Sequence, residues 1–126
     1  MATCLVIDDS ESMREVASEI LSGLGHDVRE AADAAAGIAA CEGGTRVEAV
    51  LLDWDLPGLG ALDFLRGAAA LDPRPTIILC ATENDARQFG LARAVGAGFH
   101  VLKPYDRTSI AEVMADAGFE AGQAVA

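Results

Sequence analysis

The sequence contains few basic residues. It has 9 Lys and Arg against 20 Asp and Glu, which gives a formal net charge of −11 at pH 7. Proteins that bind DNA or RNA through the phosphates need clustered Lys and Arg. The charge balance therefore argues against a nucleic-acid partner, and it is compatible with binding a divalent cation or the basic surface of another protein.

Long hydrophobic runs and paired cysteines are also absent. No apolar stretch approaches the 18 residues that a membrane-spanning helix needs, and the N-terminus lacks the pattern of a signal peptide. We therefore expect a soluble, cytoplasmic protein with no membrane partner. The three cysteines lack CxxC spacing, and Cys4 and Cys80 stand within apolar segments, which favours core thiols in a reducing compartment.

The chain does contain a regular alternation of short apolar segments and helical patterns. Its 126 residues predict one domain over residues 1–126, with a tail that frays from about residue 118. The expected strands are 3–7, 26–31, 47–53, 76–81 and 99–102. A helix is expected after each strand, the first capped by Ser10, the second by Asp33, the fourth over 84–95, and the last with Ser109 and Glu112 at capping-box spacing.

Five such strand–helix units in series predict an α/β fold with helices on both faces of a parallel sheet. The expected architecture is a flavodoxin-like, doubly wound (βα)5 sheet of order 2-1-3-4-5, whose switch point lies between the first and third strands. The central strand is the apolar run that ends at Asp53. This short apolar run predicts a strand that is buried on both faces.

Charged side chains follow the ends of the predicted strands. Asp8 and Asp9 end the first strand, Asp53 the third and Lys103 the fifth, so the fold gathers three carboxylates and one ammonium in one cleft. Crowded carboxylates repel one another, and a hard divalent cation such as Mg²⁺ relieves that repulsion. A carboxylate beside such a metal can accept a phosphoryl group, whose charge the metal and the lysine neutralise.

These motifs give the chain a clear family resemblance. It resembles the single-domain receivers, or response regulators, of bacterial two-component signalling, and is similar to the chemotaxis response regulators. The motifs that carry the resemblance are Asp8-Asp9-Ser10 with Met13-Arg14, Asp53-Trp54-Asp55-Leu56-Pro57, Thr82-Glu83-Asn84-Asp85, Gly96-Ala97 and Lys103-Pro104. The match runs from Cys4 to about Ala117.

The resemblance assigns roles to the acidic residues. It implies that Asp53 is the phosphoacceptor and that Asp9 and Asp53 bind Mg²⁺ through their side chains. Asp55 would bind the metal through its backbone carbonyl, and Asp8 largely through water. The phosphoryl donor would be a histidine kinase or a histidine phosphotransfer protein.

The residues around Lys103 follow the family less closely. Lys103 would contact the phosphoryl group, and its bond to Pro104 is expected to be cis. Counting back from Lys103 by the family's usual spacing leads to Ala81, where receivers carry a Ser or Thr that moves to bind the phosphoryl oxygen. Either the connection between the fourth strand and the fourth helix is one residue shorter and Thr82 makes this contact, or the hydroxyl is absent. We favour Ala81 at the switch position. His100 stands where the family carries a Tyr or Phe.

The output of such a receiver is a change in protein contacts. The resemblance implies a downstream protein that binds the face made by the fourth helix, the fifth strand and the fifth helix. Phosphotransfer then modifies the chain itself, so we do not class it as an enzyme. The alternatives are a pseudo-receiver that binds a partner without phosphorylation, and a small phosphatase of the haloacid dehalogenase type.

Three aromatic side chains have no settled role in this interpretation. Trp54 either reports on metal or phosphate binding or is a half-buried loop aromatic. His100 is interpreted as a partly exposed strand residue, with a pH-sensitive switch as the alternative. We interpret His26 as an ordinary turn residue.

Overall fold

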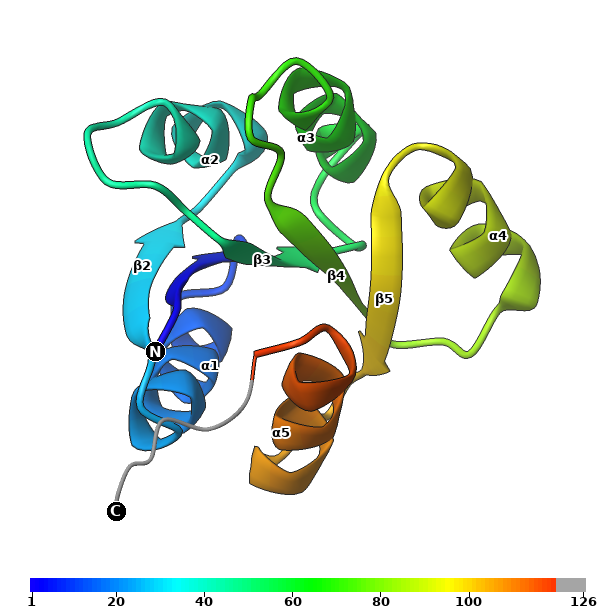
Figure 1. The fold of residues 1–126 in the computed structure, drawn as a ribbon. Coiled ribbons are helices and arrows are strands. Elements are labelled where there is room, and N and C mark those ends of the chain that lie inside the picture. Colours follow the sequence, from blue (N-terminus) through cyan, green and yellow to red (C-terminus); the bar gives the residue numbers. More distant parts are fainter. Residues whose placement is uncertain (120–126) are drawn as a thin grey trace.

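The computed structural model describes residues 1–119, which alternate between strands and helices (Figure 1). The elements are β1 (Thr3–Ile7), α1 (Glu11–Gly23), β2 (Asp27–Ala31), α2 (Ala34–Cys41), β3 (Ala49–Asp53), α3 (Gly60–Ala68), β4 (Thr76–Ala81), α4 (Ala86–Ala94), β5 (Ala97–Leu102) and α5 (Arg107–Asp116). All strand pairs are parallel, in the order β2-β1-β3-β4-β5. The predicted fold class and strand order are confirmed.

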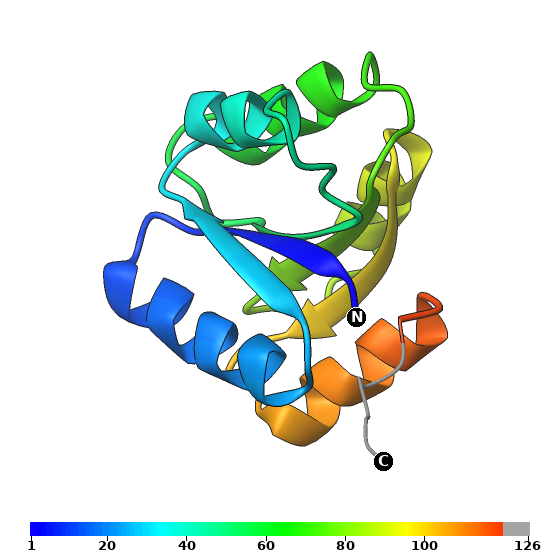
Figure 2. The ribbon, with the colours of Figure 1, turned by 60° about the vertical axis from the view of Figure 1, so that its left-hand side comes forward.

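The sheet is the middle of three layers. Helices α1 and α5 cover one face, while α2, α3 and α4 cover the other (Figures 1 and 2). Successive side chains of a strand point to opposite faces, and β3 is buried throughout. Its Val50 and Leu52 therefore pack toward α2–α4, and its Ala49 and Leu51 toward α1 and α5.

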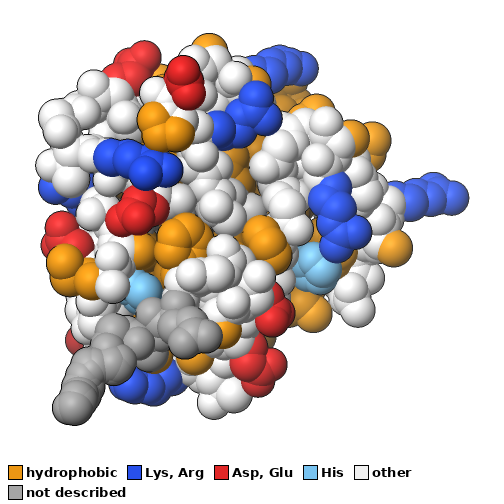
Figure 3. All heavy atoms as spheres, in the orientation of Figure 1, with side chains coloured by type: hydrophobic (Ala, Val, Ile, Leu, Met, Phe, Trp, Pro, Cys, Tyr) orange, Lys and Arg blue, Asp and Glu red, His pale blue; other side chains and the backbone are white. Residues whose placement is uncertain are grey.

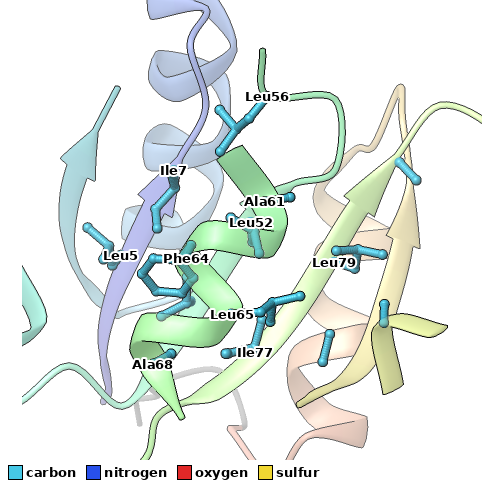
Figure 4. Packing of buried hydrophobic residues seen from close by; sticks show 14 of the residues in the cluster. Leu5, Ile7, Leu52, Leu56, Ala61, Phe64, Leu65, Ala68, Ile77 and Leu79 are labelled. Atoms are coloured by element: carbon cyan, nitrogen blue, oxygen red, sulfur yellow. The ribbon is translucent and has the colours of Figure 1, made fainter. Parts of the chain in front are cut away.

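The core on the α3 side is built around one aromatic ring. Phe64 of α3 is fully buried and lies among Leu5, Ile7 and Leu52 of the two central strands (Figure 4). Burying a side chain of this kind contributes about 1.5–3 kcal/mol. This packing fixes α3 and the preceding loop, which follows directly from Asp53.

Several boundaries differ from the sequence prediction. Strand β2 begins at Asp27 rather than at residue 26, β3 begins at Ala49 rather than at residue 47, and α4 covers Ala86–Ala94 rather than 84–95. Strand β5 begins at Ala97 rather than Phe99, because Gly96 alone makes the turn with φ of 116° and Ala97 already pairs with Ile77. The predicted capping box of Ser109 and Glu112 is wrong. Helix α5 begins one turn earlier, with a capping box of Asp106 and Ser109. The Asp106 side chain accepts a hydrogen bond of 2.8 Å from the Ser109 amide. The Ser109 hydroxyl oxygen accepts one of 2.9 Å from the Asp106 amide.

His26 lies in the turn between α1 and β2, as interpreted, but it is not an ordinary turn residue. Its ring is buried, and Nδ1 accepts a hydrogen bond of 3.1 Å from the Ala2 amide. Burial and, secondarily, the N-terminal ammonium lower the pKa of His26. Its Nε2 is buried without a partner among residues 1–119. The imidazole is therefore held neutral, and it accepts a hydrogen bond from the residue that precedes β1.

Two of the cysteines lie in the core, as the sequence predicts. Cys4 and Cys80 are core residues whose pKa values burial raises to about 12, so both stay neutral thiols. None of the described helices has the length and hydropathy needed to span a membrane. The predicted fraying from about residue 118 concerns mainly residues 120–126, which lie outside the described part of the chain.

Candidate functional site

The acidic residues and the lysine converge at the carboxyl edge of the sheet. Asp53 is the last residue of β3, Asp8 and Asp9 directly follow β1, and Lys103 directly follows β5. Because β1 and β3 are neighbours in register, with Ile7 beside Leu52, the loops after them leave the sheet at one place. This is the switch point where open α/β sheets bind ligands.

The ammonium of Lys103 lies between two carboxylates. Its Nζ donates to Asp8 Oδ2 at 2.9 Å and to Asp53 Oδ1 at 3.0 Å. Carboxylate oxygens of Asp8, Asp9 and Asp53 all lie within 4.8 Å of one another, with Asp8 and Asp53 buried and Asp9 exposed. The structure thus brings together the three carboxylates and the lysine that sequence reasoning selected.

Backbone groups hold the two buried carboxylates in fixed orientations. Asp53 Oδ1 accepts a hydrogen bond of 3.0 Å from the Asp55 amide, and Asp8 Oδ1 accepts one of 2.9 Å from the Ser10 amide. Arg14 donates to the carbonyl oxygen of Asp8 at 2.8 Å. Asp53 Oδ2 accepts no hydrogen bond from any of the residues 1–119, which makes it the oxygen available to a ligand.

Sequence reasoning gave Arg14 no role in the site. Its side chain also pairs with Glu30 of β2 at 3.2 Å, so it ties the loop after β1 to the neighbouring strand. Its place on the first turns of α1, above the end of β1, was the signal available in the sequence.

The proton affinities of Asp53 and Lys103 are coupled. Burial raises the pKa of Asp53, and the charge of Asp8 adds to this rise, while hydrogen bonds from the Asp55 amide and Lys103 oppose it. Burial alone would lower the pKa of Lys103, but its hydrogen bonds to Asp8 and Asp53 and their charges outweigh burial and raise it. Lys103 is therefore a permanent cation at neutral pH.

The donor set fits a hard divalent cation. One ammonium faces three carboxylates, so two negative charges remain uncompensated within the cluster. The ligand atoms are oxygens, which Mg²⁺ prefers, and the exposed Asp9 leaves room on the solvent side for the waters that Mg²⁺ retains. Asp8, Asp9 and Asp53 can thus hold Mg²⁺ together with one more oxygen from the loop after β3.

Ala81 occupies the end of β4 beside this cluster. It is 1% exposed, and its carbonyl accepts a hydrogen bond of 2.7 Å from the Lys103 amide. Thr82 follows it outside the strand and is exposed, with its Oγ1 donating to Asp55 Oδ2 at 3.2 Å. The hydroxyl of Thr82 therefore contacts Asp55, in the loop after β3, and not Asp53 or Lys103.

The remaining predicted residues are His100, Trp54 and Pro104. His100 of β5 is half-buried and stacks on Phe89 of α4, with ring centroids 3.9 Å apart and an angle of 16° between the planes. Sequence reasoning missed Phe89, whose signal was that it is the one aromatic residue of the predicted helix 84–95. Trp54 is half-buried directly after Asp53. The Lys103–Pro104 peptide bond is cis.

Comparison with known proteins gives a consistent match. Residues 4–115 match the family model described as "Response regulator receiver domain". A "Chemotaxis protein CheY homolog" of Campylobacter jejuni is 28% identical over 118 residues, covering 89% of this chain and 88% of the relative. "Chemotaxis protein CheY1" of Helicobacter pylori is 30% identical over 105 residues, covering 80% of this chain and 84% of the relative.

Solved structures agree with this assignment at the level of the fold. The chemotaxis response regulator CheY4 of Vibrio cholerae superimposes with a TM-score of 0.84 at 24% identity, over 92% of this chain and 98% of that chain. The fold, the carboxylates at the strand ends and the family match over most of the chain lead to one conclusion. The chain belongs to the response regulator receiver family, with chemotaxis-type proteins among its relatives.

Proposed function

We propose that the chain is a phosphoacceptor receiver of a two-component phosphorelay. It would take a phosphoryl group from a histidine kinase or a histidine phosphotransfer protein onto Asp53 and signal by protein contact. The observation that carries this proposal is the environment of Asp53, whose Oδ1 is held by Lys103 at 3.0 Å while Oδ2 has no partner among residues 1–119. A carboxylate with one oxygen fixed and the other available is suited to nucleophilic attack.

The transfer can be written from the residues present. Asp53 Oδ2 attacks the phosphorus of phosphohistidine, the phosphorus–nitrogen bond breaks, and an aspartyl phosphate forms as the imidazole leaves with the bonding pair. Lys103, held next to Asp53 Oδ1, is placed to pair with a phosphoryl oxygen. The Asp55 amide keeps the attacking carboxylate in place.

Mg²⁺ is the proposed cofactor of this reaction. We propose that it binds to Asp8, Asp9 and Asp53 and to the backbone carbonyl of Asp55, Asp8 acting largely through water. When bound, Mg²⁺ would neutralise charge on the transferring oxygens and on the crowded carboxylates.

The partners follow from the family. The chain modifies itself and relays a state, so we propose a signalling protein rather than an enzyme, located in the cytoplasm. The downstream target would bind the face made by α4, β5 and α5, where phosphorylation is expected to change the surface. The names of the relatives make chemotaxis one such pathway.

The environment of Ala81 favours weak coupling between phosphorylation and output. Ordinary receivers use a hydroxyl at this position to bind the phosphoryl oxygen, and Ala81 has none. The two states then differ by fewer contacts, and a state that gains fewer contacts is populated less. Such a chain would serve as a phosphate sink, as a relay intermediate, or as a binder that differs little between its two states.

The decisive experiment is intact-protein mass measurement after treatment with acetyl phosphate. We expect one phosphoryl adduct on the unmodified chain with Mg²⁺, and none without Mg²⁺ or in Asp53→Asn. Asp116→Asn, which removes an exposed carboxylate from α5, is the matched control and should still be modified. Trp54 fluorescence with beryllofluoride gives a second readout of the same site.

Each other outcome selects a different function. Absence of any adduct or fluorescence change would leave the pseudo-receiver as the best reading. Sustained release of phosphate from an added phosphate ester, dependent on Asp53, would instead indicate a phosphatase.

A further inference from the structure

A pocket of about 350 Å³ lies at the opposite edge of the sheet from Asp53. It is lined by the C-terminal parts of α3 and α4 and by the chain that leads into β4 and β5. Its rim carries Arg66, Arg74 and Arg93, which are three of the nine basic residues of the chain. The proposed phosphoacceptor function gives this pocket no role.

The clustering is unusual for so acidic a chain. Apart from Lys103, all basic residues of the sequence are arginines, and no Asp or Glu lines this pocket. Arg74 and Arg93 form no ion pair within residues 1–119, and Arg66 has only Asp63 at 3.7 Å, with both side chains mostly exposed. The rim therefore holds guanidinium charge that no carboxylate of the described residues compensates closely.

Helix dipoles account for only part of this arrangement. Arg66 and Arg93 stand in the last turns of α3 and α4, where a cation is favourable. Arg74 belongs to neither helix; its guanidinium donates to the Ala69 carbonyl at 3.1 Å, just past the end of α3. That bond uses one of the five donors of the guanidinium and leaves the others for a ligand.

The pocket is open to solvent, and part of its lining is apolar. Buried Leu65 forms part of its floor, and Val95, a large hydrophobic residue that is 46% exposed, forms part of its wall. Figure 3 shows basic side chains over α3 and α4 with hydrophobic side chains between them. Arg93 also borders the contact of Phe89 with His100, so a ligand here would touch the helix that packs on β5.

We propose that this arginine pocket binds a small phosphorylated molecule with an apolar part, such as a nucleoside polyphosphate. Guanidinium groups pair with phosphate in bidentate geometry, and a pocket of a few hundred Å³ with an apolar floor is typical of small-molecule sites. The net charge of −11 repels large polyanions at long range, which favours a small ligand over nucleic acid. The apolar floor would receive the base, and the arginines would receive the phosphates.

The test is isothermal titration of the full chain with ATP, in EDTA and at low salt. EDTA keeps divalent cations away from the Asp8–Asp9–Asp53 cluster. We expect saturable binding of one ATP, weakened about tenfold by Arg93→Gln and by Arg74→Gln. Arg87→Gln removes the same charge from the first turn of α4, outside the pocket, and should leave the affinity unchanged. Higher salt should weaken binding.

Asp53→Asn separates this proposal from the phosphoacceptor function, because the pocket should bind ATP equally well in that variant. No saturable ATP binding, or an equal loss in Arg87→Gln, would overturn the pocket assignment. Pyrophosphate binding as tightly as ATP would overturn the role of the apolar floor. Binding of a poly-glutamate peptide without ATP binding would overturn the small-molecule assignment in favour of an acidic protein partner.

Discussion

The amide of Lys103 donates a hydrogen bond of 2.7 Å to the carbonyl of Ala81. This bond joins the end of β4 to the residue that holds Asp8 and Asp53. Because this bond fixes the alignment of β4 with β5, the methyl group of Ala81 lies at the end of β4, next to Lys103. We propose that Ala81 stands at the switch position, where the family resemblance implies a hydroxyl.

Replacing Ala81 by Ser should strengthen the response to phosphorylation. A hydroxyl that binds a charged oxygen contributes roughly 1.5–3 kcal/mol, and this contribution exists only in the phosphorylated state. We expect a larger difference in amide hydrogen exchange over α4 and β5, with and without beryllofluoride and Mg²⁺, in Ala81→Ser than in the unmodified chain.

Thr82→Ala is the control for this substitution. It should leave the response unchanged if position 81 is the switch position. A response that is the same in Ala81→Ser and lost in Thr82→Ala would instead assign the hydroxyl to Thr82.

Mg²⁺ should stabilise the chain through Asp53. Removal of the ion leaves Asp8, Asp9 and Asp53 with only Lys103, so unfolding by heat should occur at a lower temperature in EDTA. At an Mg²⁺ concentration 100 times Kd the expected gain is about 2.7 kcal/mol. Asp53→Asn should lose most of this gain, which calorimetry with and without Mg²⁺ would measure.

The raised pKa of Asp53 makes the stability of the metal-free chain depend on pH. A carboxyl group whose pKa is raised by folding stabilises the folded state at low pH, and this contribution is lost as pH rises through the folded pKa. In EDTA, Asp53→Asn should therefore be more stable than the unmodified chain at pH 7. An Asn variant that is less stable at pH 7 would show that the site is not strained by its charges.

Acidification should weaken the anchoring of the N-terminal strand through His26. The pKa of His26 is lowered in the folded state, so its contribution is complete above the usual value of about 6.5 and is lost as pH falls below it. Protonation also converts Nδ1, which accepts from the Ala2 amide, into a donor. Urea unfolding should show a loss of at most about 2 kcal/mol from this group between pH 7 and pH 5, because this is the free energy of protonating one free imidazole over that interval.

His26→Gln should remove part of this pH dependence, because its amide oxygen can accept the same hydrogen bond and does not titrate. A variant with the same pH profile as the unmodified chain would mean that other groups cause the loss.

Two helical glycines should respond in opposite directions to alanine. A Cβ at Gly37 of α2 would lie 2.5 Å from Cδ1 of the buried Ile7 and 3.2 Å from the Phe64 ring. Overpacking costs about 1–3 kcal/mol, which outweighs the gain in helix propensity. A Cβ at Gly90 of α4 meets nothing within 4 Å, so Gly90→Ala should stabilise the chain by about 0.5–1 kcal/mol.

Chemical denaturation of both variants would measure the difference. Equal stabilisation by the two substitutions would mean that α2 can shift away from β1 and α3 without cost.

The sequence predicts the parts of the molecule that depend on local pattern. The apolar run before Asp53 identifies the central strand, and Ser10 and Asp33 cap the helices as expected, through bonds to Met13 and Ala36. The convergence of Asp8, Asp53 and Lys103 follows because parallel strands end at the same edge. Each of these inferences needs only strand order and turn chemistry.

Other features depend on packing that the sequence does not encode locally. His26 resembles a turn residue, and only the position of Ala2, just before the neighbouring strand β1, makes it a buried acceptor. Asp106 caps α5 one turn before the Ser109–Glu112 pattern that predicts the start, because two capping patterns overlap there. Arg66, Arg74 and Arg93 are far apart in the sequence, and their convergence requires α3 and α4 to lie on the same face of the sheet.

Asp8 and Lys103 are 95 positions apart, yet they are joined by one bond of 2.9 Å. Nearly the whole length of the receiver must therefore have been synthesised, and all five strands assembled, before the acceptor has its cation. A growing or partly unfolded chain exposes Asp53 without Lys103 and without the neighbouring carboxylates. Under the phosphoacceptor function that we propose, competence to accept a phosphoryl group is thereby tied to the completion of folding, so incomplete chains would not draw phosphoryl groups away from complete ones.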